Sequence, residues 1–199
     1  MIVVKEEKIV VLFVEGDTEK EFFDNLIIYY RANSSSKIGN TKVFNLKGIG
    51  RFERKAASKC KYQILNSYSS ENVVVFCCYD SDVFDLAKKP PTNWKLVKKQ
   101  LKDIQIVQFN EIIAVTMIED WFLSSLDGLI SFLKLKKTPK LKGKNAYEKI
   151  KILFKLGNKI YQKGSNSHRF INYLDFSKIR KVRKKELKKL EKELNFTEK

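Results

Sequence analysis

Apolar runs alternate along the chain with segments in which apolar residues recur every three or four positions. The runs at 8–14, 42–46 and 72–79 are short and rich in β-branched or aromatic residues, which is typical of strands. Helical periodicity is found in the segments at 19–31, 51–68 and 92–102. This alternation predicts an α/β domain in which helices flank both faces of a central, mostly parallel sheet.

The ends of the first helix and the next strands can also be predicted. Thr18 is expected to cap the first helix, with Glu21 completing a capping box. Further extended segments are expected at 104–109 and 112–117. A helix containing Trp121 should follow them.

The last third of the chain is rich in lysine and has helical periodicity. Residues 176–194 predict one basic amphipathic helix, with apolar residues on one side and lysines or arginines elsewhere. We therefore expect an α/β domain at 1–135 and a basic helical extension packed on it at 136–199. The boundary is soft, and a single domain also fits this length.

Acidic residues stand where two of the predicted strands end. Glu15 follows the first strand. Asp80 directly follows the strand at 72–79, and Asp82 comes two residues later. Ligands of parallel sheets bind outside the carboxyl ends of the strands. Two residues that are two apart on an extended segment project to the same side, roughly 7 Å apart at Cα. Hard cations such as Mg²⁺ and Mn²⁺ prefer carboxylate oxygens, so these acids predict a divalent-metal site.

Each of these acids alone also fits a purely structural role. An Asp-x-Asp pair after a strand is commonly a turn or a helix cap. Glu19 lies near the start of the first helix, and Glu119 near the start of a later one. Acids in the first helical turn interact favourably with the helix dipole without any further function.

Taken together, three motifs resemble those of the Toprim fold, which topoisomerases, primases and OLD-family nucleases share. They are Glu15-Gly16-x-Thr18-Glu19, Asp80-x-Asp82, and Glu119 before Trp121-Phe122-Leu123. Within that fold the chain is most similar to small bacterial proteins of the RloB and abortive-infection type. The resemblance covers residues 8–125 clearly and the remainder loosely, and it implies a Rossmann-like arrangement of the predicted sheet.

The resemblance also implies roles for the acids. Glu15 would be a metal ligand or general acid/base, and Asp80 and Asp82 would bind Mg²⁺ or Mn²⁺. Glu19 and Glu119 would be further ligands or supports for a second ion. The implied catalytic set is Glu15, Asp80, Asp82 and Glu119. The implied setting is bacterial or phage-borne anti-phage defence.

The charge of the chain favours a polyanionic partner. Forty Lys and Arg against 23 Asp and Glu give a formal net charge of +17, for which nucleic acid is the obvious partner. An excess of Lys over Arg also fits a solubility or codon-composition effect. The basic residues expected to contact backbone phosphates are Lys47, Arg51, Arg54, Lys55, Lys88, Lys89, Lys163 and Arg169.

These observations predict a metal-dependent nuclease that cleaves RNA, such as tRNA, or DNA. The alternatives are a nucleotidyl or phosphoryl transferase with the same metal site, and a non-catalytic subunit that binds nucleic acid or a protein partner. The sequence has no Gly-x-x-x-x-Gly-Lys-Ser/Thr motif, so an ATPase sensor would be a separate protein. Whether the protein is a monomer or a homodimer stays open.

Cysteine usage and hydropathy bear on location. The chain has three cysteines, two of them adjacent in the strand at 72–79, which is neither a disulfide framework nor a zinc pattern. We find no signal-peptide pattern and no apolar run long enough to cross a bilayer. A cytoplasmic protein without a membrane partner is therefore expected.

Overall fold

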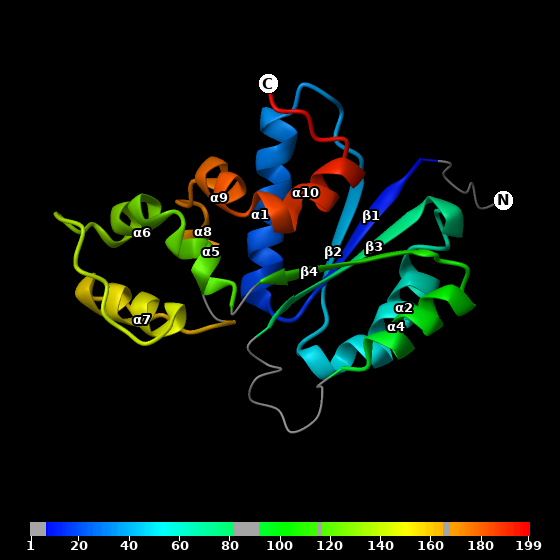
Figure 1. Cartoon of the computed structure of the whole chain (residues 1–199), viewed down its shortest axis with the longest axis horizontal. Helices are drawn as coiled ribbons and strands as arrows, with labels where there is room; N and C mark the ends of the chain where they lie inside the picture. Colours follow the sequence, from blue (N-terminus) through cyan, green and yellow to red (C-terminus); the bar gives the residue numbers. More distant parts are fainter. Residues whose placement is uncertain (1–6, 82–91, 115–116, 165–167) are drawn as a thin grey trace.

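The computed structural model describes residues 7–81, 92–114, 117–164 and 168–199. In these ranges it has one sheet of four parallel strands in the order β2-β1-β3-β4 (Figure 1). The strands are β1 (Ile9–Val14), β2 (Asn40–Asn45), β3 (Val73–Asp80) and β4 (Gln108–Ala114). The prediction of an α/β fold with a parallel central sheet is confirmed.

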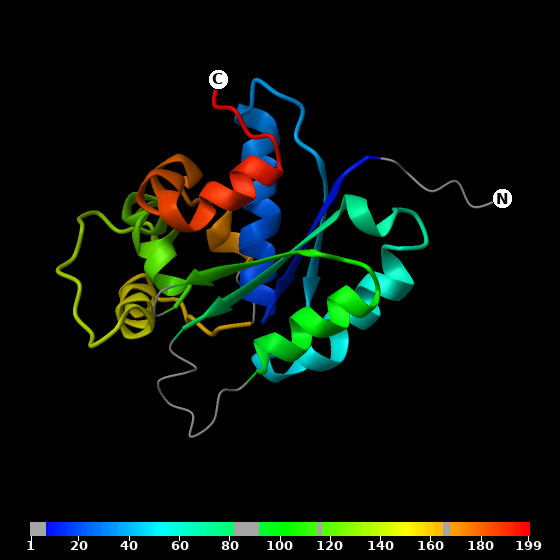
Figure 2. The ribbon, with the colours of Figure 1, turned by 45° about the vertical axis from the view of Figure 1, so that its right-hand side comes forward.

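Helices cover both faces of the sheet (Figures 1 and 2). One face carries α2 (Phe52–Gln63) and α4 (Trp94–Asp103). The other face carries α1 (Asp17–Asn33) and α10 (Lys184–Glu193), and its apolar cluster extends into five further helices: α5 (Glu119–Leu123), α6 (Leu126–Leu133), α7 (Ala146–Leu156), α8 (His168–Ile171) and α9 (Phe176–Val182). Short 3-10 turns precede α2 at Ile49–Arg51 and β3 at Ser70–Asn72.

The two central strands are buried on both faces. Val10, Leu12 and Val14 of β1 belong to the apolar cluster on the α1 side, whereas Val11 and Phe13 belong to the cluster beneath α2 and α4. Successive side chains of a strand point to opposite faces, so a strand covered on both sides must be apolar at every position. This is why β1 and β3 are continuous apolar runs in the sequence.

The strand order creates a topological switch point between β1 and β3. The chain leaves β1 through α1 on one face, whereas α4, the next helix among the described residues after β3, lies on the opposite face. These neighbouring strands pair in parallel, from Ile9 with Val73 to Val14 with Cys78. A crevice outside the carboxyl ends of such a pair is the usual ligand position in open α/β sheets. Glu15 and Asp80 both lie at this edge.

The start of the first helix differs from the sequence prediction. Helix α1 begins at Asp17, and its N-cap residue, Gly16, makes no side-chain capping bond. Thr18 is completely buried, and its Oγ1 accepts a hydrogen bond from the Gly164 N–H at 2.8 Å. The predicted Thr18 cap is therefore wrong, because this hydroxyl is used for a tertiary contact.

Two predicted element boundaries also differ. The strand expected at 104–109 begins only at Gln108, because α4 ends at Asp103 and a turn follows at Gln105, whose φ is 65°. The single helix expected at 176–194 is divided into α9 and α10 at Arg183, whose Nη2 donates to the Asp120 carbonyl at 2.9 Å. Within the described ranges, every helix is too short or too polar to span a bilayer.

Candidate active site

Asp80, the last residue of β3, is the centre of an acidic cluster at the carboxyl edge of the sheet. Its side chain is almost completely buried, and Oδ1 accepts a hydrogen bond from the Ile118 N–H at 2.9 Å. The Asp80 backbone N–H donates to Oε1 of Glu15 at 2.9 Å. This bond fixes the Glu15 carboxylate beside Asp80, as expected for residues that end adjacent parallel strands.

The ammonium of Lys163 lies among three carboxylates of this cluster. Lys163 Nζ is 2.5 Å from Asp80 Oδ2, 3.2 Å from Glu19 Oε1 and 4.0 Å from Glu119 Oε2. We predicted Lys163 as a phosphate contact, and the structure brings it directly into the acidic site. These three carboxylates come from β3, α1 and α5, and they converge on one cation.

Glu19 occupies its place because residue 16 is glycine. A Cβ atom built on Gly16 would lie 2.7 Å from Glu19 Oε2, which is closer than non-bonded atoms tolerate. Glu19 is 4% exposed, and within the described residues neither of its carboxylate oxygens has a hydrogen bond. A buried carboxylate without hydrogen bonds is costly unless a cation faces it. Lys163 is that cation in this structure.

Glu119 is held by a residue that the sequence did not reveal. Glu119 is 1% exposed, and its Oε1 accepts a hydrogen bond from the hydroxyl of Tyr161 at 2.8 Å. Tyr161 is only two residues before Lys163, so one short segment supplies both groups. The bond between Gly164 and Thr18 attaches the same segment to α1.

Burial and charge set the pKa values of the site in opposite directions. Burial raises the pKa of Asp80 to about 8, against the opposing effect of Lys163. Burial likewise raises the pKa of Glu119 above its ordinary value. For Lys163, burial lowers the pKa, but the charges of Glu19, Asp80 and Glu119 outweigh it, so the pKa is raised. The ammonium therefore stays charged, and its charge favours the ionised forms of Asp80 and Glu119 against the effect of burial.

The donor chemistry of the cluster fits Mg²⁺ or Mn²⁺, but its present arrangement is built around Lys163. In the described residues, no three His, Cys, Asp or Glu side chains are arranged as a ready metal site. Carboxylate oxygens are nonetheless the preferred ligands of hard divalent ions. The buried, unbonded oxygens of Glu19 are the strongest sign that this cluster is made to hold a cation.

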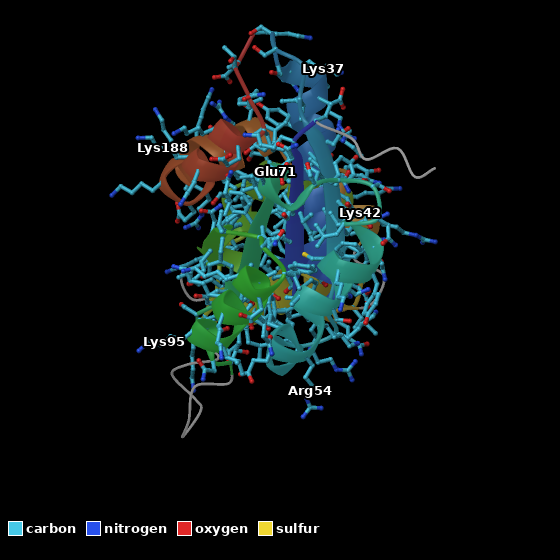
Figure 3. The ribbon with its side chains drawn as sticks, turned by 90° about the vertical axis from the view of Figure 1, so that its right-hand side faces the viewer. Lys37, Lys42, Arg54, Glu71, Lys95 and Lys188 are labelled. Atoms are coloured by element: carbon cyan, nitrogen blue, oxygen red, sulfur yellow. The ribbon has the colours of Figure 1, made fainter. Side chains whose placement is uncertain are left out.

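The remaining predicted site residues are Asp82 and the basic phosphate contacts other than Lys163. Asp82, Lys88 and Lys89 lie outside the described residues. Lys47 forms an ion pair with Asp17 at the start of α1, with Nζ 2.7 Å from Oδ1. The remaining predicted phosphate contacts lie near the start of α2 or in α8, and all but the half-buried Lys55 are exposed: Arg51, Arg54, Lys55 and Arg169. Figure 3 shows Arg54 pointing away from the body of the protein.

Comparisons with known proteins give a single kind of similarity. No family model matches the chain, and no curated protein matches it. Among solved structures, the chain is similar to the C-terminal region of the Burkholderia pseudomallei OLD protein, with a TM-score of 0.42 and 15% sequence identity. The similarity covers 91% of this chain and 98% of that one. The chemistry of the acidic site is therefore inferred from the residues of this chain.

The raised pKa of Asp80 predicts how stability depends on pH. Because folding raises this pKa to about 8, the folded protein holds a proton that the unfolded chain releases near pH 4. In EDTA, the Asp80 contribution to the free energy of unfolding should fall as the pH rises from about 4 to about 8. Asp80→Asn removes this contribution, so its stability relative to wild type should increase over the same range. Urea unfolding across this pH range measures the difference.

Asp127→Asn serves as the control for this experiment, because the Asp127 side chain is 76% exposed. Its stability relative to wild type should change little with pH. A relative stability of Asp80→Asn that is constant, or that decreases with rising pH, would contradict the assigned pKa shift.

Proposed function

We propose that this protein is a divalent-metal-dependent nuclease. The observation that carries the proposal is the convergence of Glu15, Glu19, Asp80 and Glu119 at the switch point of a parallel sheet, with buried oxygens that require a cation. A chain with a net charge of +17 suits a polyanionic substrate. The motif resemblance to Toprim proteins supports the same chemistry.

In this proposal, Glu19, Asp80 and Glu119 hold Mg²⁺ or Mn²⁺, with Asp82 as a further ligand and Glu15 as a ligand or general acid/base. A divalent ion held by these residues would supply Lewis-acid chemistry, lowering the pKa of a water molecule and neutralising the oxygen that leaves phosphorus. The chain itself supplies the rigid frame. Glu15 is oriented by the Asp80 N–H, and Glu119 by the Tyr161 hydroxyl.

Lys163 has a separate role in the proposal. Its side chain is 41% exposed, so its ammonium can move from the carboxylates toward solvent and a phosphate group. In this proposal, the displaced ammonium then contacts a phosphate of the substrate. The exposed Arg51 and Arg54 at the start of α2 extend the positive surface for the backbone of the substrate.

The biological setting that we propose is anti-phage defence, in which the protein cleaves RNA or DNA as a toxic effector. A separate ATPase would serve as the sensor. Both parts of this setting come from the family resemblance.

The nuclease proposal predicts metal-dependent cleavage that requires the buried carboxylates. With Mg²⁺ or Mn²⁺, the wild-type protein should cleave at least one of labelled tRNA, single-stranded DNA and duplex DNA. Asp80→Asn and Glu119→Gln should each reduce the rate by about 100-fold or more, because each removes a charge that holds the metal. Asp127→Asn, which alters an exposed carboxylate on α6, should cleave at the wild-type rate.

Circular dichroism of each variant separates loss of chemistry from loss of folding. The absence of metal-dependent cleavage on all three substrates, from a wild-type protein that binds them, would overturn the nuclease proposal in favour of a binding subunit. Incorporation of nucleotides into a product would favour a transferase instead.

The arrangement around Lys163 predicts that its ammonium and a divalent ion compete for the same carboxylates. Lys163→Met removes the competing charge, so Mn²⁺ should bind roughly 10-fold more tightly, which corresponds to about 1.4 kcal/mol. Isothermal titration calorimetry at constant ionic strength measures this affinity. Lys178→Met is the matched control, since Lys178 pairs with the exposed Asp127 and should leave Mn²⁺ binding unchanged. Weaker Mn²⁺ binding by a folded Lys163→Met protein would show that the two cations do not compete.

A further inference from the structure

The outer edge of the sheet carries a second basic feature, away from the acidic cluster. Among the described residues, β4 pairs only with β3, so its other edge has no strand beside it. A groove of about 320 Å³ lies along this edge and is lined by Trp94, Lys95 and Lys98 of α4, Phe109 and Glu111 of β4, and Lys189 of α10. In Figures 1 and 2, β4 lies between α10 and α4. We call this feature the edge groove.

Positive charge reaches the edge groove from both sides of the sheet. Lys95 and Lys98 come from the helix on one face, and Lys189 from the helix on the other. In Figure 3, Lys95 of α4 and Lys188 of α10 extend from the same side of the molecule. The acidic residue of the groove, Glu111, accepts a hydrogen bond from the Tyr79 hydroxyl at 2.7 Å. The charge of the groove is therefore suited to a phosphate chain.

Two aromatic side chains lie within this positive groove. Trp94 is stacked on Tyr79 with ring centroids 4.4 Å apart and an interplanar angle of 20°, and it makes an edge contact with Phe52. These contacts hold the indole rigidly at the start of α4. Phe109 is half-buried on β4. Grooves that bind single-stranded nucleic acid combine positive charges for the backbone with aromatic rings on which bases stack.

Strands β3 and β4 lead from the edge groove toward the acidic site. Tyr79, which supports Trp94 and bonds to Glu111, directly precedes Asp80 in β3. Strand β4 runs from Phe109 and Glu111 to Ala114, which pairs with Asp80 in register. The rise along a strand places Glu111 about 10 Å before that point. A strand of nucleic acid in the groove would therefore lead toward the carboxylates.

We propose that the edge groove binds single-stranded nucleic acid, with phosphates at Lys95, Lys98 and Lys189 and a base against Trp94 and Phe109. This inference rests on the proposed nuclease function and names the strand form of its substrate. Unpaired bases are needed for stacking, and a duplex does not offer them along a groove. RNA and DNA share the chemistry that the groove recognises.

Protection of the sheet edge and pairing with a second copy of the chain both fit this surface less well. Lysines are common on edge strands, where they prevent unwanted pairing, but this does not account for two aromatic rings beside them. Pairing with the same edge of a second copy would bring two sets of these lysines together. Like charges facing each other across an interface are unfavourable.

The test uses the full chain in EDTA, so that binding is measured independently of any cleavage. Fluorescence anisotropy with labelled 12-nucleotide oligo-dT, oligo-U and a 12-base-pair DNA duplex gives the affinities. One variant replaces Lys95, Lys98 and Lys189 by Ala. The control replaces Lys136, Lys137 and Lys140, which are exposed between α6 and α7, and therefore has the same net charge.

We expect the groove variant to bind both single strands at least 10-fold more weakly than the control. On a single strand, each phosphate contact contributes roughly 0.7 to the magnitude of the slope of log affinity against log salt. Removing the three lysines should therefore reduce the magnitude of this slope by about 2. Phe109→Ala should weaken binding by roughly 5- to 100-fold, the effect of losing one stacked base. Binding should also change the fluorescence of Trp94, since Trp121, the other tryptophan, is completely buried.

Several results would overturn the inference. Equal losses in the groove and control variants would show that only net charge matters. A duplex that binds as tightly as the single strands, with the same loss in the groove variant, would exclude recognition of unpaired bases. Unchanged nucleic-acid binding with a changed oligomeric state would identify the edge as a protein interface.

Groove-dependent binding without metal-dependent cleavage would support this inference and contradict only the nuclease proposal.

Discussion

Three buried carboxylates and one ammonium meet at the carboxyl edge of the sheet, and the rest of the site is organised to hold them there. Asp80, Glu19 and Glu119 come from three elements, and each is less than 5% exposed. Burying a charge is costly unless an opposite charge lies close by. Lys163 provides that charge, at 2.5 Å from Asp80 and 3.2 Å from Glu19. The convergence of the three acids therefore depends on a cation, and the proposed metal ion would take over this role.

The frame of the fold makes this convergence rigid. β1 and β3 are buried on both faces and pair in register, so Glu15 and Asp80 are fixed relative to each other by the sheet itself. Gly16 leaves room for Glu19 at the start of α1, since any side chain at this position would meet its carboxylate. The positions of Glu15, Asp80 and Glu19 are thus set largely by the backbone, which suits a site that must keep its shape when one cation replaces another.

The sequence is informative where function depends on local pattern. The apolar runs of β1 and β3 and the acids that follow them can be identified because two-sided burial requires continuous apolar residues. The resemblance to Toprim motifs adds Glu19 and Glu119 to this set. The acidic part of the site, apart from Asp82 outside the described residues, is therefore brought together as the motifs suggested.

The sequence could not place the groups that come from distant segments. Lys163 was expected to bind phosphate, and nothing in its surroundings reveals that it lies among acids from β3, α1 and α5. Tyr161 has no local signal at all, because its bond to Glu119 depends on how α7 and the following segment pack. The local pattern around Thr18 predicts a helix cap, because the sequence does not show a tertiary partner such as Gly164. The edge groove likewise combines side chains from α4, β4 and α10.

If the carboxylates around Lys163 form the site of a divalent cation, a metal ion should be seen there directly. Crystals grown with Mn²⁺ and measured at a wavelength where manganese scatters anomalously provide this measurement. We expect an anomalous peak within coordination distance, about 2.0–2.4 Å, of oxygens from Asp80 and at least one of Glu19 and Glu119, with the ammonium of Lys163 moved out of the cluster. If the ion pair of Lys163 is fully occupied and these carboxylates show no anomalous peak, the proposed divalent-metal site is contradicted.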